Sequence, residues 1–198
     1  MSGRGADGDG GARAFRLGDD VDTDQLAPGK WMKGGIEALA AHCLEEAYPG
    51  FADAVRPGDL VVAGRNFGAG SSREQAAQAL VHLGVRAVVA ESFAGIFHRN
   101  AINLGLPALV AASTAGVPDG ARVGLDLDAH RLTVRADGGA REIALEPVPE
   151  NLLALLADGG LVPHLKKRLA AERQVAERQA AERQAARRAR DDAPETRR

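Results

Sequence analysis

A glycine-rich stretch holds the residues of this sequence that are best suited to chemistry. It reads Asn-Phe-Gly-Ala-Gly-Ser-Ser-Arg-Glu over residues 66–74. We expect it to precede a helix, where free backbone N–H groups and the helix dipole favour negative charge. Arg73 can bind a carboxylate through two parallel hydrogen bonds. The stretch therefore predicts an anion site. The residues that we assign to it are Asn66, Gly68, Gly70, Ser71, Ser72 and Arg73.

The same stretch also allows a purely structural interpretation. Ser71, followed by Glu74 three residues later, has the spacing of a capping box. Capping and catalysis need not exclude each other here, because two serines are available. Two familiar phosphate motifs are excluded, since Arg73 stands where a dinucleotide fingerprint starting at Gly68 needs its third glycine, and the P-loop tripeptide Gly-Lys-Ser/Thr does not occur.

A second group of polar residues, Gly-Asp-Asp-Val-Asp-Thr-Asp, occupies residues 18–24. Its alternating aspartates resemble the start of a calcium-binding EF-hand loop. However, Gln25 stands where that loop needs glycine and Trp31 where it needs glutamate, so we reject calcium. Two interpretations stay open, namely turns made by the aspartate side chains and support of an active site. The residues that would give this support are Asp22, Thr23 and Asp24.

The elements that must position these residues form a mixed α/β pattern. Short apolar strands alternate with amphipathic helices, which favours right-handed βαβ units on a parallel sheet. The strands are expected at residues 59–64, 85–90 and 106–110, and the helices at residues 73–83 and 93–104.

The rest of the chain has a different texture. After Gly116, short strands separated by turns predict an antiparallel section. Two further helices are expected, one before the parallel strands and one after the antiparallel section. These strands cover residues 122–128, 131–135 and 141–145, and the helices cover residues 36–47 and 151–157.

Composition limits the class of protein. The 198 residues include a single cysteine, which excludes an intrachain disulfide framework and a zinc or iron–sulfur site built from this chain's own thiolates. His42 and Cys43 are adjacent on a predicted helix and point apart, so we expect no metal site. No apolar run approaches the roughly 20 residues that span a bilayer. Residues 1–14 are glycine-rich and lack the apolar core of a signal peptide, so we expect a flexible leader and a cytoplasmic protein.

The net charge of −2 conceals two oppositely charged parts. Residues 166–198 contain 11 basic and 6 acidic residues, a charge of +5, so the remainder carries −7. Within this tail Ala-Glu-Arg-Gln occurs three times with a period of five residues, which builds no apolar stripe on a helix. A solvated helix that frays near residues 191–194 is one interpretation, and a basic arm for nucleic acid or a partner is the other. The regular glutamates argue against the arm.

Taken in order, the motifs resemble the small subunits of 3-isopropylmalate dehydratase, the aconitase swivel domain made as a separate chain. The resemblance covers residues 15–169 and leaves 170–198 as an appended tail. It implies a swivelling β/β/α domain like the aconitase C-terminal domain. The motifs that carry it are residues 18–25, 57–59, 66–74, 92–94, 99–103 and 105–107.

The resemblance also implies an activity and a partner. This chain would bind no cofactor itself and would dock onto a large subunit that carries a [4Fe–4S] cluster. Together they would move the hydroxyl group of a small di- or tricarboxylic acid to the neighbouring carbon by dehydration and rehydration. Ser71 maps to the family's catalytic base, and Ser72 and Arg73 map to residues that hold a substrate carboxylate.

The substrate is less well defined by the resemblance. The family's substrate-sensing loop maps to Trp31, Met32 and Lys33, and Lys33 is neither the apolar residue that fits an isopropyl group nor the arginine that fits an extra carboxylate. Isopropylmalate is the first expectation; 2,3-dimethylmalate, homoaconitate and citraconate or maleate are alternatives. A non-catalytic nucleic-acid-binding protein ranks below these. Departures from the family pattern, which leave Ser71 and Arg73 in place, occur at Ala69, Gln75 and Gly95.

Overall fold

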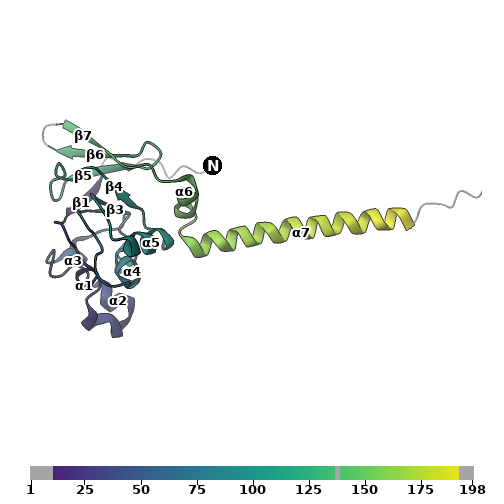
Figure 1. Ribbon diagram of the computed structural model, residues 1–198, viewed down its shortest axis with the longest axis horizontal. Helices are drawn as coiled ribbons and strands as arrows, with labels where there is room; N and C mark the ends of the chain where they lie inside the picture. The colour runs from purple at the N-terminus through teal and green to yellow at the C-terminus, as the bar shows by residue number, and fades with distance from the viewer. Residues whose placement is uncertain (1–10, 137–138, 192–198) are drawn as a thin grey trace, which may run out of the picture. The chain divides into compact units, whose positions relative to one another are not determined.

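The computed structural model describes residues 11–136 and 139–191 (Figure 1). The chain forms two compact units, with the boundary after Leu161. In the described residues of the first unit, seven strands form a sheet in the order β4-β3-β2-β1-β5-β6-β7. The strands are β1 (Ala12–Arg16), β2 (Leu60–Val62), β3 (Ala87–Ala90), β4 (Ala108–Val110), β5 (Arg122–Asp126), β6 (Arg131–Ala136) and β7 (Gly139–Ala144).

The sheet has a parallel half and an antiparallel half that meet at β1. Strand β1 pairs in parallel with β2 and antiparallel with β5, and the pairing continues in parallel to β4 and antiparallel to β7. The short helices of the first unit connect the parallel strands, except for the last one, which follows β7. They are α1 (Thr23–Leu26), the 3-10 helix η1 (Gly29–Gly34), α2 (Gly35–Ala40), α3 (Phe51–Ala54), α4 (Gln75–His82), α5 (Gly95–Asn103) and α6 (Glu150–Ala157).

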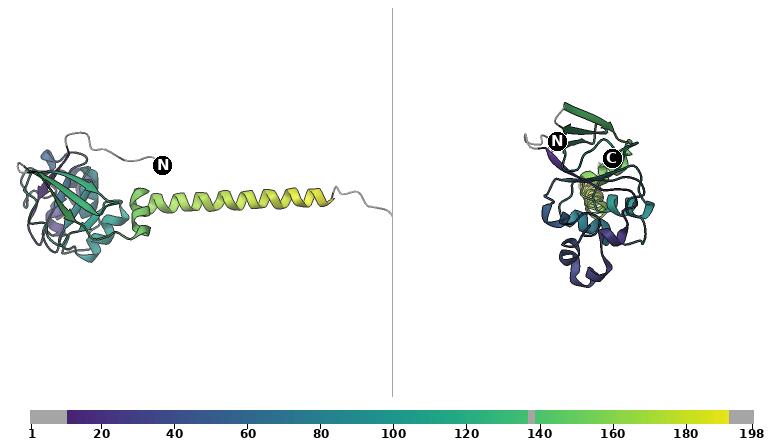
Figure 2. Two further views of the ribbon diagram at one scale, coloured as in Figure 1. Left: turned by 90° about the horizontal axis from the view of Figure 1, so that it is seen from above. Right: turned by 90° about the vertical axis from the view of Figure 1, so that its left-hand side faces the viewer.

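Successive residues of the parallel strands point to opposite faces of the sheet, and their side chains pack into two separate hydrophobic cores. Phe15, Val61 and Val88 pack on the helical side of the sheet, whereas Leu60 and Val89 pack on the opposite side against apolar residues of β5, β6 and β7. The antiparallel half therefore curls over one face of the parallel half while helices cover the other (Figures 1 and 2). This is the expected β/β/α arrangement, and each large apolar side chain buried in it contributes about 1.5–3 kcal/mol.

Most elements expected from the sequence are present, and the first strand corrects one expectation. Residues 12–14 were expected to belong to a flexible leader, but they begin β1, the strand that joins the two halves of the sheet. Ala14 and Phe15 are fully buried there. The strand is stabilised by ladders on both sides, and its sequence Ala-Arg-Ala-Phe-Arg gives little local signal for a strand. Residues 1–10 lie outside the described residues.

The helix expected at residues 36–47 is also shorter than predicted. It ends at Ala40 as α2, and turns follow. Leu44 then adopts φ +61°, in the left-handed region that interrupts a helix, and its N–H donates to the Gln25 carbonyl at 2.8 Å. A tertiary hydrogen bond to the segment after β1 therefore replaces the helical pattern.

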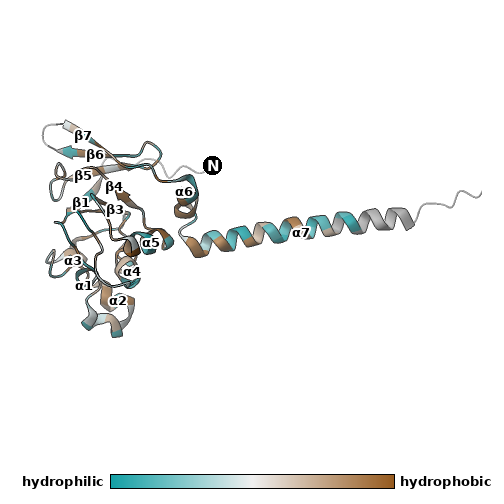
Figure 3. Cartoon of the chain, in the orientation of Figure 1, coloured by the Kyte–Doolittle hydropathy of each residue, from teal (hydrophilic) through white to brown (hydrophobic). Residues whose placement is uncertain are grey.

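In the tail, helix α7 (Leu161–Asp191) begins before the boundary expected at residues 169/170. Arg168 and Arg178 each form an ion pair with the glutamate four residues later. Hydrophilic and hydrophobic residues alternate along its described part (Figure 3). No helix in the part of the chain that the structure describes is long and apolar enough to cross a membrane.

Candidate active site

The predicted site residues gather where the parallel strands end. The loops after β1 and β2 carry them, and the loops after β3 and β4 lie beside these two. The carboxyl edge of a parallel sheet is the usual ligand-binding edge of an α/β protein.

The loop after β1 ends in a capped helical turn. Asp22 accepts a hydrogen bond from the Gln25 N–H at 2.8 Å, and the Gln25 side chain accepts one from the Asp22 N–H at 3.0 Å. This is a capping box, and it fixes the first turn of α1. It thereby fixes Thr23, which is 1% exposed, and Asp24, which is exposed.

The glycine-rich loop after β2 lies against this turn. The Thr23 N–H donates to the Ala69 carbonyl at 2.8 Å, and the Ser71 N–H donates to Thr23 Oγ1 at 3.0 Å. Ser71 Oγ lies 3.1 Å from the same Thr23 oxygen. Gly70 has φ +103°, and a Cβ there would lie 2.9 Å from Thr23 Oγ1, so the loop needs glycine to admit the hydroxyl.

The structural interpretation of Ser71 as a helix cap is wrong. Helix α4 begins at Gln75, four residues later, and its N-cap is Glu74 without any side-chain capping bond. Ser71 and Ser72 are instead exposed on the loop before the helix. Ser71 is therefore a solvent-accessible hydroxyl whose position is set by Thr23.

Arg73 is partly buried between the loop and α1. Its Nη1 contacts the Asp24 carboxylate at 2.6 Å and the Ala27 carbonyl at 2.8 Å, and its side chain is 19% exposed. Its Nε and Nη2 make no hydrogen bond to the described residues. These two atoms form one edge of the guanidinium group, the edge that binds a carboxylate side-on. One edge of Arg73 is thus used for positioning, and the other is available for a ligand.

The expected substrate loop forms η1. Met32 and Lys33 are exposed, while Trp31 stacks on His42 with ring centroids 3.7 Å apart. Among the described residues, no hydrogen bond or ion pair joins residues 31–33 to Ser71 or Arg73. The structure therefore brings the glycine-rich stretch together with the supporting residues Asp22, Thr23 and Asp24. Within the described part of the chain, it shows no hydrogen bond or ion pair between either of them and the substrate loop.

A small charged cluster supports the tryptophan. The Glu45 carboxylate lies 2.7 Å from Lys30 Nζ and 2.7 Å from His42 Nδ1. Hydrogen bonds from Lys30 and His42 lower the pKa of Glu45 to about 2. Neighbouring Cys43 is buried, and burial raises the pKa of its thiol. Cys43 thus stays protonated, and no group of three or more His, Cys, Asp or Glu residues in the described chain is arranged to hold a metal ion.

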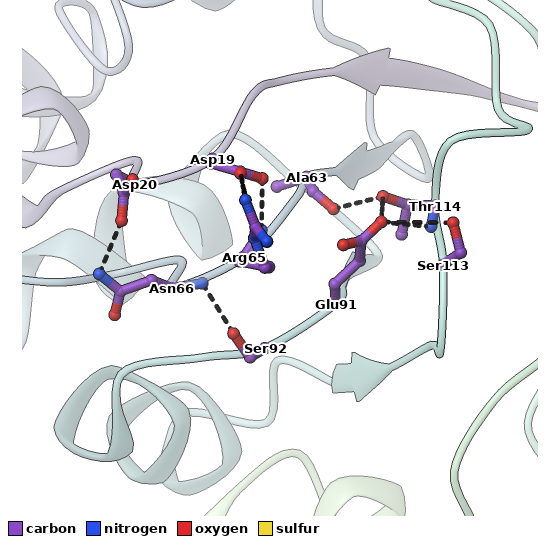
Figure 4. Close-up of polar contacts among 9 residues, drawn as sticks. All are labelled: Asp19, Asp20, Ala63, Arg65, Asn66, Glu91, Ser92, Ser113 and Thr114. Carbon is purple, nitrogen blue, oxygen red and sulfur yellow. Dashed lines mark hydrogen bonds and ion pairs between the residues drawn. The ribbon is translucent and has the colours of Figure 1, made fainter.

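Asp19 and Arg65 belong to a network that the sequence analysis missed (Figure 4). Asp19 accepts hydrogen bonds from the Arg65 N–H at 2.8 Å and from its guanidinium at 2.6 Å, and these bonds lower the pKa of Asp19. Asn66 Nδ2 donates to Asp20 at 2.9 Å, and its backbone N–H donates to Ser92 Oγ at 2.8 Å. Asp20 and Asn66 both have φ near +60°, a strained conformation held by these contacts.

The same network continues to the loop after β4. The Thr114 N–H donates to Glu91 at 3.0 Å and lowers the pKa of that carboxyl, and the Thr114 hydroxyl donates to the Ala63 carbonyl at 2.8 Å. Ser113 lies 3.4 Å from Glu91 (Figure 4). The loops after all four parallel strands are therefore joined into one platform. The position of Glu91 and Ser92 directly after a predicted strand was the available signal for it.

Comparisons with known proteins identify relatives of this chain. Residues 29–113 match the aconitase C-terminal domain. The chain is 48% identical over 158 residues to a methanogen homoaconitase small subunit from Methanothermobacter thermautotrophicus, covering 79% of this chain and 91% of that protein. It is 46% identical over 157 residues to a 3-isopropylmalate dehydratase small subunit from Archaeoglobus fulgidus, covering 78% and 93%.

A solved structure extends the likeness to three dimensions. The crystal structure of a 3-isopropylmalate dehydratase from Methanocaldococcus jannaschii superimposes with a TM-score of 0.77 at 42% sequence identity. The match covers 82% of this chain and 96% of that one.

Proposed function

We propose a function from the premise that this chain belongs to the family of 3-isopropylmalate dehydratase small subunits, whose fold is the aconitase C-terminal domain. The chain is the small subunit of a hydro-lyase that interconverts 2- and 3-isopropylmalate by dehydration and rehydration. The observation that carries the site assignment is the pairing, on one exposed loop, of the Ser71 hydroxyl with the uncommitted edge of the Arg73 guanidinium.

The geometry supports distinct roles for three residues. Arg73 binds a substrate carboxylate through Nε and Nη2 while Asp24 and Ala27 hold its Nη1. Ser72, exposed beside it, donates a further hydrogen bond to that carboxylate. Ser71 Oγ removes the proton from the carbon next to the carboxylate, and returns it in the reverse reaction.

The chemistry of this chain requires a partner. An iron–sulfur cluster is held by thiolates, whereas the single cysteine, Cys43, is buried with its pKa raised. The residues of this chain therefore do not fit such a cluster, and we assign the [4Fe–4S] cluster to a large subunit that docks on the exposed loop. A buried free thiol is also consistent with a reducing compartment, which supports a cytoplasmic location.

A second substrate class is favoured by specific observations. A relative named homoaconitase small subunit is as similar to this chain as the isopropylmalate relatives are. Lys33 is exposed on η1 and has no ion-pair partner among the described residues, so its ammonium group is free to attract an additional carboxylate. Homoaconitate, which carries a third carboxylate, is therefore the first alternative to isopropylmalate, and 2,3-dimethylmalate and citraconate or maleate are further ones.

The proposal is tested by reconstitution. The chain is co-expressed with the large-subunit homologue of its own organism, and the purified complex is assayed with isopropylmalate and each alternative acid. We expect turnover by the complex and none by this chain alone. Ser71→Ala should lower kcat by at least about 10²-fold without dissociating the complex. Near-normal turnover of this variant would refute the role of Ser71, and no turnover of any of these acids by the wild-type complex would refute the proposed function.

A further inference from the structure

We propose that Thr23 is a positioning residue that donates a hydrogen bond to Ser71 Oγ and stabilises the ionised form of that serine. This inference rests on the proposed function, because it gives Ser71 the means to act as a base. A serine hydroxyl is a weak base in water, so its environment must supply the difference.

The contacts of Thr23 make its hydroxyl specific to Ser71. Thr23 is 1% exposed, so water does not compete for its oxygen. Its Oγ1 accepts a hydrogen bond from the Ser71 N–H at 3.0 Å and lies 3.1 Å from Ser71 Oγ. Among the described residues, no other hydrogen bond involves this oxygen.

These contacts determine the direction of the second hydrogen bond. A hydroxyl has one hydrogen to donate, and the Ser71 N–H already occupies an acceptor position on Thr23 Oγ1. If Ser71 donated to Thr23, the Thr23 hydrogen would be buried without an acceptor, an arrangement that folded proteins avoid. The Thr23 hydroxyl therefore donates to Ser71 Oγ, and the Ser71 hydrogen is directed elsewhere.

This direction matters for the reaction. A hydrogen bond donated to an anionic oxygen is roughly twice as strong as one to a neutral hydroxyl, so Thr23 favours the Ser71 alkoxide over the alcohol. In dehydration the substrate C–H bond breaks, its proton forms the Ser71 O–H bond, and its electron pair forms the carbon–carbon double bond as the substrate hydroxyl leaves as hydroxide, for which the partner's cluster would be the Lewis acid. In hydration hydroxide adds to one carbon while the Ser71 proton returns to its neighbour, which restores the alkoxide.

The backbone around Thr23 fixes the position from which its hydroxyl reaches Ser71. The Thr23 N–H is bound to the Ala69 carbonyl at 2.8 Å, and the capping box of Asp22 and Gln25 fixes the turn that carries Thr23. Gly70 leaves the space that the hydroxyl needs. Because Thr23 is also held by its own backbone, these anchors remain when its side chain is changed, although a variant without the hydroxyl removes the acceptor of the Ser71 N–H.

The test uses the assembled complex with its large subunit and three variants of this chain. Thr23→Val keeps the size and shape of the side chain but removes the hydroxyl, and with it both the donor to Ser71 Oγ and the acceptor of the Ser71 N–H. It should lower kcat by about 10²–10³-fold with KM changed by less than about threefold. Thr23→Ser restores the donor and should return kcat to within about tenfold of wild type. The rising, low-pH limb of the kcat–pH profile for dehydration, which follows the ionisation of the base, should also move to higher pH in Thr23→Val, which loss of packing alone would not cause.

Two results would overturn the inference. One is a Thr23→Val complex that keeps more than about one tenth of wild-type kcat, and the other is a Thr23→Ser complex as slow as Thr23→Val. If Thr23→Val does not assemble with the large subunit, Thr23→Cys provides the test, because its S–H is a weak hydrogen-bond donor. A kcat of Thr23→Cys about tenfold or more below that of Thr23→Ser supports the inference, and equal kcat values contradict it. Wild-type turnover and the Ser71→Ala variant report separately on the proposed function.

Discussion

Replacing Gly68 by alanine should destabilise the loop that carries Ser71. Gly68 has φ +78°, and a Cβ at this position would lie within 3.0 Å of three carbon atoms of the Phe97 side chain. Phe97 cannot easily retreat, because it is 2% exposed and packs edge-on against Phe67 with ring centroids 5.1 Å apart. The substitution therefore combines a strained backbone with an overfilled core.

The magnitude follows from these two terms. The left-handed conformation costs an L-residue about 1–2 kcal/mol, and inserting a methyl group into a packed core costs about 1–3 kcal/mol. Alanine recovers about 0.4–1 kcal/mol by restricting the unfolded chain. The net loss in the free energy of unfolding is about 2–4 kcal/mol, which corresponds to a fall in Tm of about 4–16 °C for a protein of this size.

Thermal unfolding followed by circular dichroism measures this loss, and Gly95→Ala is the matched control. Gly95 begins α5, two residues before Phe97, and a Cβ there would have no neighbour within 4 Å. Alanine at Gly95 should leave Tm unchanged or raise it by a few degrees, because it favours the helix.

A double-mutant cycle isolates the contact with Phe97. In a Phe97→Leu background the methyl group at Gly68 meets a smaller, more flexible side chain, so the cost of Gly68→Ala should fall by about 0.5–3 kcal/mol. Equal Tm for Gly68→Ala and Gly95→Ala would refute the argument from close packing. An unchanged cost in the Phe97→Leu background would show that backbone strain alone is responsible.

Two further predictions concern charged groups. Arg73→Lys keeps an ion pair with Asp24 but loses the free guanidinium edge, so kcat/KM of the complex should fall about 10- to 150-fold in steady-state assays; wild-type kinetics would exclude carboxylate binding by that edge. The pKa of Glu45 is lowered to about 2, so its ionised form stabilises the fold at neutral pH and this contribution is lost as pH falls from about 4.5 to 2. Glu45→Gln should lack that part of the pH dependence of Tm. Because His42 stacks on Trp31 and would lose its bond to Glu45, the variant should also change the fluorescence of this single tryptophan. A dependence of Tm on acid pH identical to that of wild type would contradict the ion-pair argument.

Sequence patterns within a short segment predicted the helices and strands that have their own flanking turn residues or their own run of apolar residues. Helices α4 and α5 follow glycine-rich or turn segments and end two residues before a glycine, and both appear within a few residues of the expected positions. Strands β2, β3 and β4 are apolar runs, so burial on both faces is visible in the sequence. Strand β1 is the exception, because its central place depends on two neighbouring strands that lie far away in the chain.

The capping motifs show the limit of such patterns. Ser71 with Glu74, and Asp22 with Gln25, both have a cap residue followed three positions later by a partner, yet only the second pair forms a capping box. The spacing of each pair is the same, so spacing alone cannot choose between them. Tertiary structure makes the choice, because the Ser71 N–H and Oγ are already engaged by Thr23.

The pairing of the site residues nevertheless follows a simple rule once β1 is known. The parallel register of β1 and β2 pairs Ala14 with Leu60, an offset of 46 residues. The loops keep this offset in the contact of Asp19 with Arg65, which is also separated by 46 residues. The glycine-rich loop then adds two residues, and Thr23 meets Ser71 at a separation of 48. The register of β1 and β2 therefore extends into the loops that follow them. The two extra residues in the glycine-rich loop then place the buried hydroxyl of Thr23 opposite Ser71, the candidate base.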